Sequence, residues 1–221
     1  MEQIFAHMDP ALQLMLTMAG LSLLPFVLVS MTSFMRYVIV LSILKTAMGT
    51  QQVPPGIVLV GISLLLTIYT MSPVFGEMYE MAEGPINRNE AVFTVLAEAS
   101  VPLKNFMMRQ TRQEDLSYIL ELAREVPPES PADVQIWEVA PAYMISELRT
   151  AFEIGFLIFI PFIVLDMVVA NILLALGMMM LSPTIISLPF KILIFIAVDG
   201  WSLIIHGLIK AQLTPSRCFA G

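Results

Sequence analysis

The sequence predicts an all-α, membrane-embedded protein whose long, kinked helices form two hairpins around a helical middle segment that faces water. Hydrophobic residues make up 57% of the 221 residues and charged residues only 13%, whereas a soluble domain carries about 25% charged residues. Uncharged stretches such as 46–76 and 167–190 exceed the roughly 20 apolar residues that cross a bilayer. The stretch from Glu77 to Glu153, in contrast, holds 20 of the 29 charges.

This charge distribution divides the chain into three expected segments. Residues 1–76 form a hydrophobic N-terminal hairpin, residues 77–140 an acidic, mainly helical segment, and residues 141–221 a hydrophobic C-terminal hairpin with a short tail. The starting residues include Glu2 and Asp9 but no Lys or Arg, so we expect no cleaved signal peptide.

The first hairpin is expected to begin with a helix from Ala11 towards Lys45 that bends at Pro25. Pro54, Pro55 and Gly56 predict a turn, because proline removes a backbone donor and restricts the residue before it. A second helix is expected over 57–75.

In the middle segment, Thr111 and Glu114 have the spacing of a capping box and predict a helix start. A further start is expected at Ser130-Pro131. The second hairpin is predicted as a helix over 141–177, kinked at Pro161, followed by a returning stretch over 185–209.

The basic residues predict the orientation in the membrane. Arg36, Lys45 and Lys191 lie near the two hairpin turns, whereas the stretch from Glu77 to Glu153 carries 14 acidic and 6 basic residues. Because basic residues favour the cytoplasmic side, we expect the turns in the cytoplasm and the middle segment on the opposite, periplasmic side.

Two aspartates, Asp166 and Asp199, lie inside apolar stretches, where an ionised carboxylate is disfavoured by about 2.5–3.5 kcal/mol on insertion scales. One interpretation is an intramembrane aspartyl protease, in which two carboxylates share a proton. The other is pairing with Arg36, Arg149 or Lys191 of the same or a neighbouring chain. The residues around both aspartates lack the Gly-x-Gly-Asp context expected of such proteases, which favours pairing.

Other catalytic patterns are absent from the sequence. It has no His-Glu-x-x-His, no glycine-rich phosphate loop and no nucleophile elbow, and its one cysteine, Cys218, excludes a cysteine metal cluster. A net charge of −7 without a basic cluster argues against nucleic acid as a partner. We therefore predict no enzyme, no cofactor and no metal. A small-solute channel or transporter stays an alternative, because ionisable residues in apolar spans can mark a pathway.

Methionine is unusually frequent, with 17 residues, three of them consecutive at Met178, Met179 and Met180. As filler, methionine packs into irregular gaps, and this is the plainer interpretation. As a flexible, polarizable side chain it could instead seal a pore, since hydrophobic constrictions exclude water.

Several short groups of residues stand in a fixed order along the chain. They are Thr32-Ser33-Phe34, Gly49-Thr50-Gln51-Gln52-Val53-Pro54-Pro55, Met71-Ser72-Pro73-Val74, Ser146-Glu147-Leu148, Ala151-Phe152-Glu153-Ile154-Gly155-Phe156, Gly177-Met178-Met179-Met180, Ile186-Ser187-Leu188-Pro189-Phe190-Lys191 and Val198-Asp199-Gly200-Trp201. Together, from about residue 20 to residue 210, the sequence closely resembles the FliP/SctR family of type III secretion export-gate proteins.

The resemblance implies a subunit of a homopentameric ring in the bacterial inner membrane, reaching towards the periplasmic side. Its implied partners are proteins of the FliQ/SctS and FliR/SctT kinds, and the assembled gate passes unfolded substrate proteins. Met178, Met179 and Met180 match the family's methionine loop, which lines the narrowest part of the channel as a gasket. The resemblance thus favours the sealing interpretation of these residues.

Six charged residues are expected to pair between helices or between subunits, because a ring brings each one next to a neighbouring copy. They are Glu147, Arg149, Glu153, Asp166, Lys191 and Asp199. Between the two branches, Ala170-Asn171-Ile172 and His206-Gly207-Leu208 resemble virulence-associated injectisome members, whereas Arg109-Gln110-Thr111-Arg112 resembles flagellar members. The balance slightly favours the injectisome.

Overall fold

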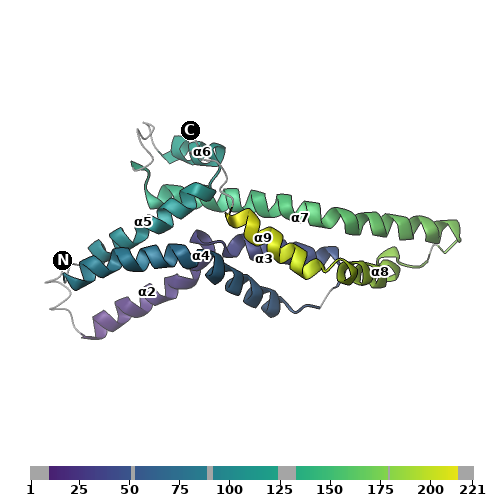
Figure 1. Cartoon of the computed structure of the whole chain (residues 1–221), viewed down its shortest axis with the longest axis horizontal. Helices are drawn as coiled ribbons and strands as arrows, with labels where there is room; N and C mark the ends of the chain where they lie inside the picture. The colour runs from purple at the N-terminus through teal and green to yellow at the C-terminus, as the bar shows by residue number, and fades with distance from the viewer. Residues whose placement is uncertain (1–9, 51–52, 89–91, 124–132, 179, 214–221) are drawn as a thin grey trace. The chain divides into compact units, whose positions relative to one another are not determined.

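The computed structural model describes residues 10–50, 53–88, 92–123, 133–178 and 180–213. These residues form eight helices and no strand, which confirms the all-α fold class (Figure 1). The helices are α2 (Pro10–Met31), α3 (Phe34–Ala47), α4 (Gly56–Asn87), α5 (Val92–Gln110), α6 (Gln113–Ala123), α7 (Ile136–Ala175), α8 (Pro183–Ala197) and α9 (Gly200–Leu213). The helix start expected at Ser130-Pro131, the N-terminal nine residues and the tail with Cys218 lie outside the described residues.

Among the helices that the structure describes, α4 and α7 are long and apolar enough to cross a membrane. Up to four crossings result if each of two bent pairs counts as one span, namely residues 25–31 with α3, and α8 with α9. Length and composition therefore agree with the expected membrane-embedded hairpins.

Pro25 does not end the first helix, and the chain breaks further on. Helix α2 continues through Pro25, and the break comes at Thr32–Ser33. Just before this break, the Ser30 hydroxyl donates to the Phe26 carbonyl at 2.7 Å and the Thr32 hydroxyl to that of Leu28. Such bonds from a side chain back to its own helix compete with the backbone ladder and bend helices.

Helix α4 extends to Asn87, beyond the predicted end at Phe75. The prediction ended the helix where the apolar stretch ends. The residues that follow include Glu, Met and Ala, which are all good helix formers. Helix α4 also continues through Pro73, and the neighbouring Met71 and Val74 are buried. Packing and propensity therefore extend the helix into the acidic segment.

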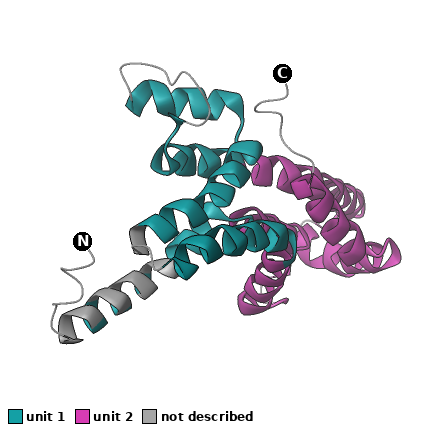
Figure 2. Ribbon diagram, turned by 60° about the vertical axis from the view of Figure 1, so that its left-hand side comes forward, with its two compact units in different colours: residues 1–33, 69–146, 216–221 teal, residues 34–68, 147–215 magenta. Residues whose placement is uncertain are grey.

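The chain forms two compact units, each assembled from separate stretches of sequence (Figure 2). The first unit contains residues 1–33, 69–146 and 216–221. Its core is built from α4, α5, α6 and α7, with Met107 and Tyr143 fully or almost fully buried. The Phe106 ring meets the Tyr143 ring edge-on, with 6.0 Å between centroids.

The second unit contains residues 34–68 and 147–215. Its core takes Tyr37, Leu41 and Leu44 from α3, Leu59 from α4, and residues of α7, α8 and α9. All charged residues that the sequence predicted as pairing partners belong to this unit.

Candidate functional site

The methionine loop, residues 178–180, follows a sharply terminated α7. Gly177 has a φ of +72°, a left-handed conformation that glycine adopts without cost. The Met178 amide donates to the Leu173 carbonyl at 2.9 Å, and the Gly177 amide to that of Leu174 at 3.0 Å. This pair of bonds is the Schellman arrangement that satisfies carbonyls at a helix end. Gly177 therefore fixes where the loop begins.

The described methionines of this loop are exposed. Met178 is 48% and Met180 100% exposed, while Met179 lies outside the described residues. On the other side of the loop, Ser182 and Pro183 start α8, with proline in the first turn, where it costs no hydrogen bond. Two large apolar side chains are thus presented at the tip between two helices.

Lys191 lies at the centre of a polar cluster in the second unit. Its side chain is 4% exposed, and its Nζ donates to Asp166 Oδ2 at 2.7 Å and to the Ala47 carbonyl at 3.2 Å. The Ser187 hydroxyl donates to the other Asp166 oxygen. Because Ala47 is the last residue of α3, a positive charge also suits this helix end. Lys191 therefore joins α3, α7 and α8.

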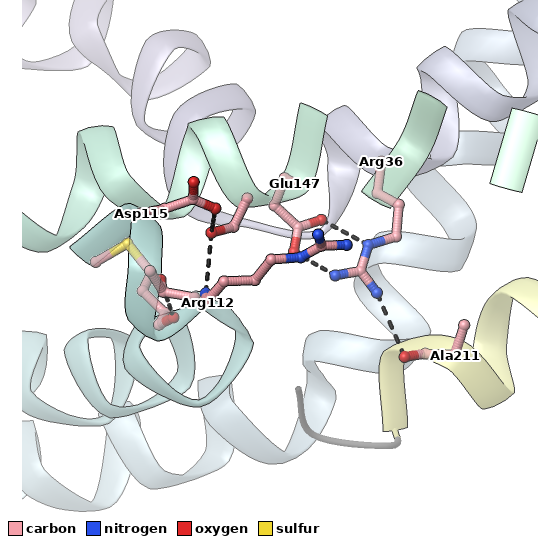
Figure 3. Close-up of polar contacts among 8 residues, drawn as sticks. Arg36, Arg112, Asp115, Glu147 and Ala211 are labelled. Carbon is pink, nitrogen blue, oxygen red and sulfur yellow. Dashed lines mark hydrogen bonds and ion pairs between the residues drawn. The ribbon is translucent and has the colours of Figure 1, made fainter. Parts of the chain in front are cut away.

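A second, deeper ion pair joins Arg36 and Glu147, whose side chains are 3% and 0% exposed (Figure 3). Arg36 Nε donates to Glu147 Oε2 at 2.7 Å, and Arg36 Nη2 donates to Oε1. The remaining Nη1 donates to the Ala211 carbonyl at 3.4 Å. The two parallel bonds match the planar guanidinium fork to the carboxylate. This arrangement links α3, α7 and α9.

The other predicted charges lie at the surface of the second unit. Arg149 and Glu153 are exposed on α7, and Asp199 is exposed between α8 and α9. The Asp199 carboxylate makes no ion pair with any other residue that the structure describes. The expected turn at Pro54, Pro55 and Gly56 leads directly into α4, which begins at Gly56.

The two aspartates of the protease hypothesis do not share a site. Asp166 is bonded to Ser187 and Lys191, and Asp199 follows Ser187 by twelve residues along α8 and its end, about 18 Å at the rise of an α-helix. A shared proton needs carboxylates about 3 Å apart. Within the part of the chain that the structure describes, no group of three His, Cys, Asp or Glu residues could hold a metal ion.

Sequence reasoning missed the serines that complete these polar contacts. Ser187 precedes Lys191 by four residues, so the two share a helix face, and this spacing was the available signal. In the first unit, the Ser146 hydroxyl donates to Asp115 Oδ2 at 2.6 Å and accepts from the Arg112 amide at 3.0 Å (Figure 3). No spacing rule links Asp115 to Ser146, because they lie on different helices.

Comparison with known proteins identifies the family. The FliP family matches residues 16–208. The chain belongs to the FliP family. It is 45% identical to the flagellar biosynthetic protein FliP of Bacillus subtilis over 94% of this chain and 97% of that protein. It is 44% identical to the FliP of Pectobacterium carotovorum, covering 91% and 78%. It is 38% identical to the Yop proteins translocation protein R of Yersinia pestis, covering 90% and 94%.

Membership of the FliP family confirms the predicted resemblance to type III secretion export-gate proteins. The matched range includes the methionine loop and both buried ion pairs. The FliP family match therefore covers every residue that the sequence singled out as a candidate site.

Proposed function

We propose that this chain is a pore-forming subunit of a type III export gate that passes unfolded proteins across the bacterial inner membrane. The single observation that supports this role best is the methionine loop. Met180 is fully exposed at the tip between α7 and α8, although burying such a side chain stabilises a protein by about 1.5–3 kcal/mol. Copies of the loop from neighbouring subunits supply that burial around a central pore.

The ring itself is a homopentamer that assembles with proteins of the FliQ/SctS and FliR/SctT kinds and reaches towards the periplasmic side. Support comes from the exposed apolar surface of α7, where Phe152, Phe156 and Leu157 are each more than 60% exposed. Exposed apolar patches of this kind mark contacts with protein or lipid. Arg149 and Glu153 are exposed on the same helix and Asp199 is exposed between α8 and α9, where a neighbouring subunit can reach them.

For the branch, we favour the flagellar system over the injectisome, contrary to the slight preference drawn from the sequence alone. Identity to flagellar proteins reaches 45% and 44%, against 38% to the Yersinia translocation protein. The test is complementation. Expression of this chain is expected to restore swimming motility to a flagellated bacterium that lacks its own FliP-family protein, and restored secretion only in an injectisome mutant would reverse the assignment.

A transporter or a protease accounts less well for the observed charges. Arg36, Glu147 and Lys191 are buried and bonded to partners in their own chain, which suits helix packing better than a solute pathway. The chain also has no sequence motif for a nucleotide. We therefore propose that it has no catalytic activity and that energy for export comes from other components.

The sealing role is tested by replacing Met178, Met179 and Met180 together with alanine. The ring is expected to assemble, but ion conductance across the membrane should rise, because the shorter side chains leave the pore partly open. Patch-clamp or dye-influx measurements on cells that make the variant report this leak.

The matched control replaces the same three residues with leucine, which keeps the apolar volume. This variant should stay as tight as the wild type. Equal conductance for the alanine variant and the wild type, in complexes shown to be assembled, would exclude the loop as the seal.

A further inference from the structure

Helices α8 and α9 meet at an elbow, residues 198–200, with a bend of 64°. No proline lies in the elbow. The bend instead comes from Asp199, which has a φ of +51°, a left-handed conformation that Asp adopts more readily than most side chains. The Asp199 amide donates to the Ile196 carbonyl and the Asp199 carbonyl accepts from the Leu203 amide, both at 3.1 Å. One residue thus ends α8 and starts α9.

The inside of the elbow is closely packed. A Cβ on Gly200 would come within 2.3 Å of the Phe195 ring, so only glycine fits against it. Phe195 is buried, and its ring meets Trp201 edge-on with 5.4 Å between centroids. The contact of Phe195 with Gly200 therefore favours the bent arrangement.

Other contributions to the free energy favour one straight helix in place of α8 and α9. In a continuous helix over residues 183–213, Asp199 would leave the left-handed region, and the backbone bonds that the break removes would form again. A cavity of about 360 Å³ borders the elbow, lined in part by Pro161 and Phe162 of α7 and by Val198 and Leu203. Phe195 and Gly200 also line this cavity, so it offers space into which the Phe195 ring can move when the elbow changes shape.

We propose that the elbow is a hinge, held bent by Asp199 and by the contact of Phe195 with Gly200, whose straightening moves the methionine loop. Helix α8 begins three residues after Met180, so a rotation of α8 about the elbow moves the loop. This rotation also breaks the contacts of Lys191 and Ser187 with α7 and α3, which add to the contributions that hold the elbow bent. This inference rests on the proposed role of the loop as the gate. The bent elbow corresponds to the sealed gate, and the straight elbow to the open gate.

The test compares Asp199→Ala with Asp199→Gly in the assembled complex. Both substitutions remove the same charge, but glycine accepts a positive φ and alanine does not. Spin labels are placed at Ile185 and Leu213, which are 71% and 64% exposed, in a Cys218→Ser background. Labelled chains are diluted with unlabelled chains so that most rings carry one label pair.

The expected distances follow from helix geometry. Each label lies fourteen residues from Asp199, so the backbone separation is about 36 Å with the observed bend and about 42 Å in a straight helix. The wild type and Asp199→Gly should show the shorter distance, and Asp199→Ala should shift towards the longer one. Identical distance distributions for the two substitutions would overturn the hinge.

Phe195→Ala provides a second route that keeps Asp199 in place. Removal of the ring should add a population at the longer distance, and a single short distance in the assembled complex would overturn the proposal. Gly207→Ala, on α9 with no atom near the added Cβ, is the control and should leave the distance unchanged.

Ion conductance separates this inference from the proposed function. Asp199→Ala should leak more than Asp199→Gly, because a straight elbow displaces the loop. A longer distance with wild-type conductance would overturn the link between the elbow and the loop. The alanine and leucine substitutions of the methionines would still decide the sealing role by themselves.

Discussion

Arg36 and Glu147 show how this chain accommodates charge in an apolar environment. Burying either charge without a partner is strongly unfavourable in free energy. Here the bidentate bond and the contact with the Ala211 carbonyl satisfy most of the guanidinium donors. Removal of one partner leaves the other buried without a counter-charge. The pair is therefore more sensitive to a single substitution than to the replacement of both residues.

We predict that Glu147→Ala lowers the free energy of unfolding by about 3–5 kcal/mol, because an uncompensated guanidinium stays buried. Denaturant titration of the protein in detergent micelles measures the change. The double substitution Arg36→Met with Glu147→Leu should recover most of the loss. Glu153→Gln, at an exposed position, is the control, and its expected change in the free energy of unfolding is under about 1 kcal/mol. An equal loss of stability in Glu147→Ala and Glu153→Gln would contradict the role of burial.

At the scale of helices, close approach depends on small residues. Gly155 of α7 is buried against α3, and a Cβ there would come within 2.4 Å of Ile43 Cδ1. Beside this contact lies an apolar groove of about 480 Å³, lined by Val38 and Ile39 of α3 and by Phe152, Phe156 and Phe159 of α7. The glycine sets how closely the two helices pack, and therefore the position of Glu147 opposite Arg36.

Gly155→Ala is predicted to destabilise the protein by about 1–3 kcal/mol, because the extra methyl group has no space. Ile43→Val removes Cδ1, the atom nearest to the added methyl group. The double variant Ile43→Val with Gly155→Ala should therefore recover part of the lost stability. Gly61→Ala on α4, where no atom lies within 4 Å of the added Cβ, should instead stabilise by up to about 1 kcal/mol. Thermal unfolding measures the stability of the four variants relative to the wild type. Unchanged stability in Gly155→Ala would show that α3 and α7 move apart at little cost.

For the whole molecule, the main feature is the amount of apolar surface that its own fold leaves uncovered. In α7, only 11% of the most apolar window is buried inside the chain, although this helix could cross a membrane. In the ring that we propose, lipid covers part of this surface and identical neighbours cover the rest. On that proposal, the apolar surface of α7 is covered only in the assembly.

Native mass spectrometry in mild detergent, with the two partner proteins co-expressed, tests the assembly. We predict a complex that contains five copies of the 24.5 kDa chain together with both partners. Asp199→Asn should weaken this assembly, because it removes a charge that we propose to pair between subunits. The distance measurements on Asp199→Ala and Asp199→Gly, which lose the same charge, therefore use the fraction of each variant that assembles. A stable, functional single copy would contradict the ring.

The sequence allowed the helical class and the membrane-spanning stretches to be predicted because both depend on local composition. It also indicated Asp166 and Lys191 as residues that need partners. It did not locate the break at Thr32–Ser33, which lies beyond Pro25 and beside the back-bonded Ser30 and Thr32 hydroxyls. The predicted helix start before α6 was nearly right, but the Thr111 hydroxyl donates back to the Met107 carbonyl at 2.7 Å instead of capping α6.

What the sequence alone determined was the helical class, the apolar stretches that could cross a membrane and the family, since hydropathy and ordered motifs are properties of the chain itself. Only the tertiary structure decided that Glu147 meets Arg36 across 111 positions, that Ser187 completes the contacts of Asp166, and that Gly155 and Gly200 face Ile43 and Phe195. The contacts of Glu147 with Arg36 and of Gly155 with Ile43 join helices far apart in the chain, and the other two depend on how consecutive helices bend back on each other. Their geometry depends on helix packing, which no local pattern encodes.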